Sequence, residues 1–414
     1  MGLISSSRLA CGMPLLVEEM SSVRSAAIAL AIPAGHGEDP LERLGMAAMW
    51  SEMLLRGCGG RSSKQDADYA DSLGIGRGVS AGTYYMTLSA TLLADRLPEV
   101  LSLIADMALK PTFDPDAFEP SRELALAAIE ALKDDPQERC LLAARERHHP
   151  APFSRSGLGT PDGLSAITHQ ELVAAWRKRC TPARSILAVA GAVRATDVAA
   201  LAESAFAGWS GQTPAFHIEN TPLRGYSHEV DQSNQVQIVL MHDAPPENAA
   251  RDRDAWLEKV VISALSGGMS GRLFSEVREK RGLCYSVSAS YRGDREYGVC
   301  LAYVGTTPER AQQSLDVLRE QLEFINTPAG RITPQEFSRA IVGMKTGVVF
   351  AGESTGARAA SLVIDQHRVD HPRPLEEIAA AISSITLDEV NAYLARRTIG
   401  TVTIQTLGPQ ELKA

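Results

Sequence analysis

Both halves of the chain carry the same order of segments, and this internal repeat constrains the fold more than any other feature. The segment ITHQELVAAWRKR beginning at Ile167 matches ITLDEVNAYLARR beginning at Ile385, so the copies are separated by roughly half of the 414 residues. A glycine also follows a strand-like apolar run in each half, at Gly191 and at Gly408. A repeat of this length predicts two homologous domains. Residues 209–227 are polar, contain prolines and have no period, which predicts a linker between the domains.

The two predicted domains cover residues 1–208 and 228–414, and each mixes strands with helices. Period-two alternation of apolar residues indicates strands, and apolar residues three and four apart indicate helices. Neighbouring strands with helices that can cover one face of their sheet favour an α+β fold over a doubly wound one. In the first domain the predicted strands span residues 15–19, 26–32, 79–91 and 186–190, and the predicted helices span residues 44–55, 63–73, 97–109, 117–132, 169–179 and 195–206.

Charge and apolar content exclude several classes of function. The 41 basic and 50 acidic residues give a net charge of −9, which offers a nucleic-acid partner no electrostatic support. No apolar run reaches the length of a membrane span. The first residues, MGLISSSRLACGMPLLVEEM, lack the uninterrupted apolar core of a secretory signal, and the folded pattern is expected to start near Arg8. The six cysteines form no C-x-x-C pair, which is typical of reduced thiols. We therefore expect a cytoplasmic protein without a membrane or nucleic-acid partner.

The stretch SGGMSGRLFSEVREKRGLCYSVSASY places a helix stop, a basic helix and a strand in one run. The glycines at 267–268 end the preceding apolar helix, and Ser270 is positioned as the N-cap of the next one. Gly282 ends that helix, and the alternation after it predicts a strand with Tyr285 and Val287 on one side. The basic residues of this helix are Arg272, Arg278, Lys280 and Arg281.

This stretch resembles the second-domain signature of the pitrilysin, insulinase and mitochondrial processing peptidase family of zinc peptidases. In that family an arginine and a tyrosine seven residues later contact the substrate beside the zinc, and Arg278 and Tyr285 have that spacing. The resemblance covers residues 8–414 and implies an α+β fold of two similar domains, each a mainly antiparallel sheet covered by helices, facing each other like a clam shell. The residues alone also allow a simpler interpretation, a capped helix with a solvated charged face.

The resemblance also locates a zinc motif that this chain has lost. Members of the family carry H-x-x-E-H on a helix, because imidazoles at i and i+4 share one face and can reach one metal ion. The matching helix reads MWSEM, with Met49, Glu52 and Met53 at the motif positions, and Ala128 occupies the place of the third ligand, a glutamate. Thioethers are poor zinc ligands, so we expect no metal and no cofactor to be bound by this chain. Glu52 is interpreted as a relic of the motif or as an ordinary surface carboxylate.

The histidines offer no convincing replacement for that site. His148 and His149 precede a proline, and His367 and His371 have helical spacing but run into Pro372, which breaks a helix. There is also no G-x-S-x-G nucleophile motif and no phosphate-binding loop. An independent catalytic centre is therefore not visible in the sequence.

These residues lead to a first interpretation and two alternatives. The first is a non-catalytic subunit of a heterodimeric zinc endopeptidase, which supplies Arg278 and Tyr285 to a peptide substrate while a homologous partner with an intact H-x-x-E-H holds the zinc. An inactive structural or peptide-binding protein, resembling the core proteins of a respiratory complex, would not need that pair. An active homodimeric peptidase conflicts with the missing ligands. We therefore expect no enzyme activity from the chain alone, and activity in peptide processing from the complex.

Overall fold

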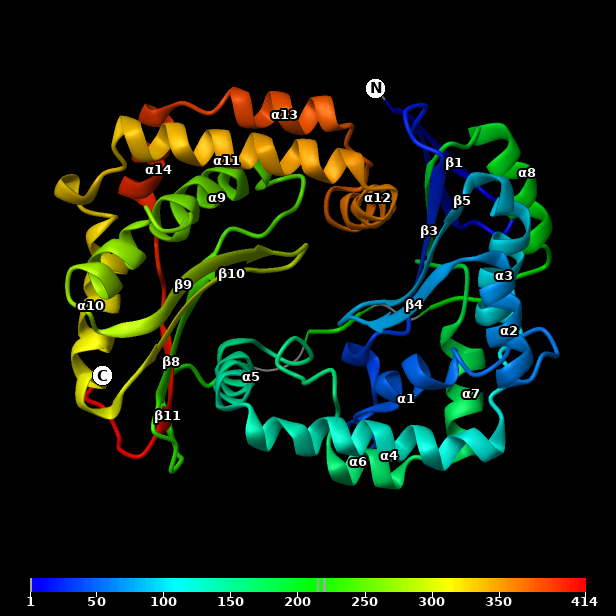
Figure 1. Cartoon of the computed structure of the whole chain (residues 1–414), viewed down its shortest axis with the longest axis horizontal. Coiled ribbons are helices and arrows are strands. Elements are labelled where there is room, and N and C mark those ends of the chain that lie inside the picture. The colour runs from blue at the N-terminus through cyan, green and yellow to red at the C-terminus, as the bar shows by residue number, and fades with distance from the viewer. Residues whose placement is uncertain (1, 214–215, 219–220) are drawn as a thin grey trace.

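The computed structural model describes residues 2–213, 216–218 and 221–414. Within these residues two sheets face each other across the molecule, with most helices on their outer sides (Figure 1). The N-terminal half, blue to green in Figure 1, forms one side, and the C-terminal half, green to red, forms the other. This arrangement confirms the predicted α+β fold with two domains in a clam shell.

Strands far apart in the sequence are neighbours in both sheets. The first sheet has the order β1-β2-β6-β3-β5-β4 and the second has the order β7-β11-β8-β10-β9. The strands of the first sheet are β1 (Leu3–Arg8), β2 (Pro14–Glu19), β3 (Ser25–Ile32), β4 (Gly76–Ala81), β5 (Met86–Leu93) and β6 (Ile186–Gly191). Those of the second are β7 (Gly225–Val230), β8 (Val236–Ala244), β9 (Cys284–Gly293), β10 (Gly298–Thr306) and β11 (Thr403–Gly408).

The two sheets have the same connectivity once β1 is set aside. Each begins with one parallel pair, β2 with β6 and β7 with β11, and continues through antiparallel pairs to an edge strand, β4 or β9. The strands β2, β6, β3, β5 and β4 thus correspond to β7, β11, β8, β10 and β9. Both the predicted repeat and the mainly antiparallel sheets are confirmed.

The strand β1 was not predicted. The sequence pattern was taken to start near Arg8, but residues Leu3–Arg8 pair with β2 in an antiparallel ladder. Its segment LISSSR has three serines and is mostly exposed, so it lacks the apolar alternation by which a strand is found. Backbone pairing with β2 holds it in the sheet, and Ile4 adds a partly buried contact with the core cluster beneath α12.

The helices predicted in the first half are confirmed to within two residues at each end. The strand β4 begins at Gly76, before the predicted strand start at residue 79. The helices are α1 (Met46–Met53), α2 (Ser63–Leu73), α3 (Leu97–Leu109), α4 (Pro115–Ala131), α5 (Pro136–His148), α6 (Pro161–Ala166), α7 (His169–Arg179), α8 (Ala195–Ala205), α9 (Asp252–Ser266), α10 (Ala311–Phe324), α11 (Pro334–Glu353), α12 (Thr355–Val369), α13 (Leu375–Ser383) and α14 (Leu387–Arg396).

The repeated segments encode the same helix start twice. The Thr168 side chain accepts a hydrogen bond from the backbone N–H of Glu171 at the start of α7, and Thr386 does the same with Glu389 at the start of α14. A hydroxyl acceptor at this position satisfies an N–H that has no partner inside the helix. The matching letters IT-x-x-E therefore give each half an equivalent helix next to its sheet.

Two repeat-related helices, α5 and α12, are exchanged between the halves. The helix α12 packs on β3 and β6 of the first sheet, whereas α5 packs on β8 and β11 of the second (Figure 1). Alternate residues of β3 point to opposite faces, so one face joins the main core and the other, rich in alanine, receives Leu362 and Val363 of α12. On the second sheet, Cys140 and Ala144 of α5 pack against Met241. Each sheet is thus buried on both faces.

Buried polar contacts accompany this exchange. The guanidinium of Arg358 on α12 is 2.7 Å from a carboxylate oxygen of Glu18 on β2, and both side chains are at most 4% exposed. On the other side, Nδ1 of His148 on α5 lies 3.0 Å from the hydroxyl of Thr403 on β11. Each exchanged helix is therefore tied to the sheet of the other half by polar as well as apolar contacts.

The boundaries of the two domains and of the linker stay predictions. The strand β7 begins at Gly225, within the predicted linker of residues 209–227, and residues 214–215 and 219–220 of that linker lie outside the described part of the chain. None of the helices formed by the described residues has both the length and the apolar content needed to span a membrane.

Candidate functional site

The helix that carries Arg278 is wound more loosely than an α-helix. Residues Phe274–Glu279 form a π-helical turn, in which the N–H of Lys280 donates to the carbonyl of Ser275. Leu273 and Val277 are buried in the core of the second half and anchor this turn. A π-turn adds one residue per turn, and such turns are frequent at functional sites because they redirect a side chain.

The predicted N-cap at Ser270 is wrong. No side chain caps this helix, and the N–H of Ser275 donates to the carbonyl of Gly271. Gly271 is buried so closely against the end of α9 that a Cβ would lie 2.9 Å from the carbonyl oxygen of Leu265. Close packing against α9, rather than a capping hydroxyl, sets the start of this helix.

Of the basic residues on this helix, Arg278 is the one left to meet a ligand. Arg272 is paired with Glu336 at 2.6 Å, and both Lys280 and Arg281 are paired with Glu276. Among the residues that the structure describes, the one acid that Arg278 reaches is Glu279, at 4.0 Å, the outer limit of an ion pair. The other basic residues of this helix are thus explained as members of ion pairs. Arg278 is not explained in that way.

Tyr285 lies in a β-bulge next to Arg278. Cys284 is opposite Thr306 and Ser286 is opposite Gly305, so Tyr285 has no residue opposite it in β10. The extra residue in a bulge turns its side chain away from the regular alternation. Tyr285 is consequently 83% exposed, whereas Val287 packs against the core, which corrects the expectation that both lie on one side.

The structure brings the predicted pair together on the open edge of the second sheet. The guanidinium carbon of Arg278 is 5.2 Å from the ring centroid of Tyr285 and 4.8 Å from that of Phe274, within the range of cation–π contact. β9 is the edge strand, so the phenol and the guanidinium are held side by side with their polar atoms free to meet a ligand. Both groups donate hydrogen bonds, and an oxyanion is the ligand that they suit.

The helix α1 places the degenerate motif in the core of the first half. The carboxylate of Asp39 accepts from the N–H groups of Gly45 and Ala47 and so fixes the start of α1. Met49 and Met53 are completely buried. Their thioethers therefore behave as core side chains.

The charged and neighbouring positions of the motif do not form a metal site either. Glu52 is partly exposed, and its nearest cation is Arg56 at 3.9 Å, one turn along the helix. On α4, Ser121 donates its hydroxyl to the Met53 sulfur at 3.2 Å, and Ala128 follows on the same helical face. Two thioethers and a methyl group supply none of the nitrogen or oxygen ligands that zinc needs, so these residues do not fit the ion.

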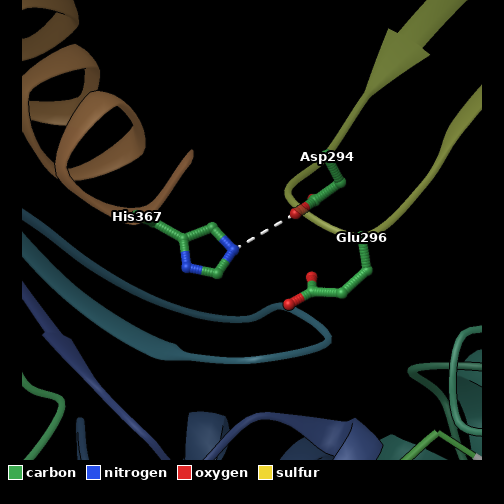
Figure 2. Close-up of side chains that lie close together, drawn as sticks. All are labelled: Asp294, Glu296 and His367. Carbon is green, nitrogen blue, oxygen red and sulfur yellow. Dashed lines mark hydrogen bonds and ion pairs between the residues drawn. The ribbon is translucent and has the colours of Figure 1, made fainter. Parts of the chain in front are cut away.

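A second polar cluster joins the two halves, and it was not predicted. Figure 2 shows Asp294 and Glu296 from the β9–β10 turn next to His367 near the end of α12, with Nε2 of His367 3.1 Å from a carboxylate oxygen of Asp294. The Tyr84 hydroxyl donates to Glu296, and the Tyr85 hydroxyl is 3.2 Å from Nδ1 of His367. Burial by itself raises the pKa of the Asp294 carboxyl, but the hydrogen bond and charge of His367 hold it below the usual value.

This cluster is best explained as a hydrogen-bonded tie between the halves. The possible ligand atoms of Asp294, Glu296 and His367 lie within 4.8 Å of one another, close enough for one divalent cation. Each of them already has a protein partner, however, and Tyr84 and Tyr85 belong to the first half. No local signal could have found this cluster, because its members are far apart in the sequence and meet only through the packing of α12.

A cleft of about 740 Å³ opens between the two halves. Its walls come from α5, from the β4–β5 turn, from β9 and β10, and from the loops around His36 and Phe153. The edge strands β4 and β9 both contribute to it, through Ala81 and Ser290. Two arginines of its wall, Arg145 and Arg292, were not singled out from the sequence.

Comparison with known proteins agrees with this architecture. A model described as insulinase (peptidase family M16) matches residues 15–156, and one described as the peptidase M16 inactive domain matches residues 166–344. An uncharacterized zinc protease of Streptomyces coelicolor is 26% identical over 408 residues, covering 96% of this chain and 88% of that protein. One of Mycobacterium tuberculosis is 27% identical over 424 residues, covering 97% and 94%.

Solved structures show the same fold over the whole chain. A peptidase M16 inactive domain from Pseudomonas fluorescens superposes with a TM-score of 0.88 at 22% identity, covering 100% of this chain and 99% of that one. A protease from Helicobacter pylori superposes with a TM-score of 0.85 at 16% identity, covering 98% and 100%. These two likenesses show the fold. The family rests on the two models above, both of peptidase family M16, which together match residues 15–156 and 166–344, and by them the chain belongs to the insulinase family of peptidases, M16, with a second half of the inactive-domain type.

Proposed function

We propose that this chain is the non-catalytic subunit of a heterodimeric zinc endopeptidase of the M16 family. One observation carries the proposal. The groups suited to an oxyanion are held together, with Tyr285 exposed and Arg278 partly exposed, whereas Met49 and Met53 fill the zinc-motif positions as buried core residues. The chain thus keeps one half of a peptidase site and lacks the other.

The chemistry of peptide hydrolysis gives the exposed pair a role in trans. Attack on a peptide carbonyl develops negative charge on the carbonyl oxygen, and preorganised donors stabilise that charge. The Tyr285 hydroxyl donates to this oxygen, and the Arg278 guanidinium donates to it or to a neighbouring backbone carbonyl of the substrate. A homologous partner with an intact H-x-x-E-H holds the zinc and the attacking water.

The edge strands support the binding of an extended peptide. β9 carries Tyr285, and among the described residues no strand pairs with the outer edge of β9 or of β4. One outward N–H of β9, that of Ala289, donates to the Ser266 hydroxyl. An edge strand offers unpaired backbone N–H and carbonyl groups, to which a peptide adds as a further strand. Backbone pairing of this kind positions a scissile bond without requiring a particular side chain.

The proposal is tested by expressing the chain with a homologous chain that carries H-x-x-E-H. Turnover of a fluorogenic peptide is measured for each chain alone and for the pair, with gel filtration to confirm association. We expect turnover from the pair only, and we expect a zinc chelator to abolish it. Equal turnover from the partner alone would leave the inactive peptide-binding or structural role as the better explanation.

A further inference from the structure

Two arginines on the wall of the cleft between the halves lack an ionic partner. Arg145 is half-buried on α5, and Arg292 is exposed near the end of β9. Within the part of the chain that the structure describes, neither side chain makes a hydrogen bond or an ion pair. An unpaired guanidinium facing a confined space is well suited to bind a carboxylate.

The other charged groups of the wall leave a positive balance. Arg139 is neutralised by Glu229 and Asp231, to which it donates hydrogen bonds. Arg155 has partners of its own, among them the backbone carbonyl oxygens of Gly37 and Asp39, so it is left out of this balance. Glu146, next to Arg145 on α5, is the remaining acid of the wall. The cleft is therefore cationic inside a chain whose net charge is −9.

The pKa values of two histidines of the wall are lowered, mainly by burial and further by nearby positive charges. Burial, followed by the charges of Arg155 and Arg292, lowers the pKa of His36 to about 4. Burial lowers the pKa of His149 to about 3, with His148 and Arg145 acting in the same direction. Both imidazoles are neutral at pH 7, and Nδ1 of His36 is buried with no hydrogen-bond partner among the described residues. The wall thus adds a neutral imidazole nitrogen to two free guanidinium groups.

The same wall contains the ends of both edge strands, which favours a peptide over a small anion. Ala81 ends β4, and Ser290 lies two residues before Arg292 on β9, so Ser290 and Arg292 face the same side of the sheet. A peptide paired along β9 passes its side chains close to the guanidinium of Arg292. Opposite it, Arg145 rises from α5, which lies on the inner face of the second sheet.

We propose that this cleft binds acidic side chains of an extended peptide, with Arg145 and Arg292 as the carboxylate-binding residues. The inference rests on the proposed role of the chain as a peptide-holding subunit and adds the class of peptide that it holds. Because the whole chain is negatively charged, long-range attraction does not favour an acidic ligand. Selectivity for acidic peptides therefore has to come from the local pair of arginines.

The test measures peptide binding to the isolated chain by fluorescence anisotropy, without any turnover. The probe is a blocked peptide, acetylated and amidated at its ends, with several glutamates, and its counterpart has glutamine at the same positions. We expect the glutamine peptide to bind about tenfold or more weakly, as for the loss of one charge-assisted hydrogen bond. Arg145→Gln and Arg292→Gln should each weaken binding of the acidic peptide by about tenfold, and Arg292→Lys by less.

Arg177→Gln on α7 is the matched control, because it removes the same charge from an exposed arginine outside the cleft. The affinity of the Arg177→Gln variant for the acidic peptide should stay close to that of the wild type. Thermal unfolding should confirm that every variant is folded. Equal affinity for the two blocked peptides, or equal weakening by Arg177→Gln, would refute the inference. Tighter binding of a neutral peptide with a free C-terminal carboxylate than of the blocked acidic peptide would also refute the inference. Failure of turnover in the pair, with this binding pattern intact, would count against the catalytic role alone.

Discussion

The exposure of Arg278 and Tyr285 comes from two irregularities of the backbone, one at each residue. A π-helical turn carries the arginine, and a β-bulge carries the tyrosine. Irregular backbone is retained where a regular helix or strand would aim a side chain elsewhere. The spacing of seven residues predicted that the two side chains are neighbours, but it did not predict either irregularity. The helix that contains the π-turn starts where Gly271 packs against the end of α9, and the bulge depends on the register of β9 with β10.

Replacing the tyrosine hydroxyl tests the chemistry of the pair without altering its packing. Tyr285→Phe should lower kcat of the reconstituted pair by about a hundredfold, since one donor to the developing oxyanion is lost. Arg278→Ala should reduce kcat/KM at least as much, with a higher KM if the guanidinium also holds the peptide backbone. Tyr69→Phe is the control, because Tyr69 also lies beneath an arginine, Arg61, but on the outer side of the first half. Unchanged turnover in Tyr285→Phe would contradict the role in trans.

The methionines of the lost motif are expected to act on stability, through packing and through the hydrogen bond that Met53 accepts from Ser121. Met53→Ala should lower the free energy of unfolding by about 2–5 kcal/mol, because it leaves a cavity in a closed core. Met53→Leu nearly conserves the volume but removes the acceptor of the buried Ser121 hydroxyl, so it should lower the free energy of unfolding by about 1–3 kcal/mol. Urea denaturation followed by circular dichroism measures both values. A small loss for Met53→Ala would mean that this part of the core is open.

At the level of elements, the exchange of α5 and α12 decides how the halves are joined. Their positions in the repeat correspond, and each covers the inner face of the sheet in the other half. The alanine-rich face of β3 allows α12 to approach closely, and the Glu18–Arg358 pair lies in the contact. Helical periods in the sequence mark an apolar face on such helices, but the pattern is the same whichever sheet covers it.

Removing one member of the buried ion pair between Glu18 and Arg358 should cost much more stability than replacing both members by apolar residues. Arg358→Met leaves the Glu18 carboxylate buried without a cation and should lower the free energy of unfolding by about 3–5 kcal/mol. The double variant Arg358→Met with Glu18→Leu should regain most of the lost free energy of unfolding, since neither charge then remains. Lys64→Met, which removes one member of an exposed i,i+4 pair with Asp68, should leave stability nearly unchanged. The comparison uses denaturant unfolding of the single and double variants, and additive losses would contradict the coupling.

At the level of the whole molecule, the space between the halves is closed by contacts that neither half contains alone. Tyr84 and Tyr85 reach the cluster of Asp294, Glu296 and His367, and both halves line the cleft beside it. The two histidines of the cleft wall, His36 and His149, are buried as neutral groups. Association of the halves should therefore depend on pH.

Stability should fall as the solution becomes acidic, because of His36 and His149. Their pKa values in the folded protein are about 4 and about 3, below the ordinary value of 6.5. Between pH 6.5 and those values the unfolded chain takes up protons that the folded chain does not, so the free energy of unfolding decreases by up to about 1.4 kcal/mol per pH unit for each group. His149→Phe should flatten this dependence in urea titrations, and His217→Phe, at an exposed position, should not. Parallel curves for wild type and His149→Phe would contradict the assignment.

Local signals in the sequence determined much of this protein. The repeat, the helices with their threonine caps, the two methionines in the zinc motif and the spacing of Arg278 and Tyr285 are all readable because each depends on residues close together in the chain. The serine-rich β1 was missed because it is held mainly by backbone pairing and has no apolar alternation. Only the tertiary structure decided which sheet each exchanged helix covers, how the bulge turns Tyr285 outward, and that Arg145 and Arg292 share one cleft. These features depend on contacts between distant segments, and a period specifies which face is apolar without specifying what packs against it.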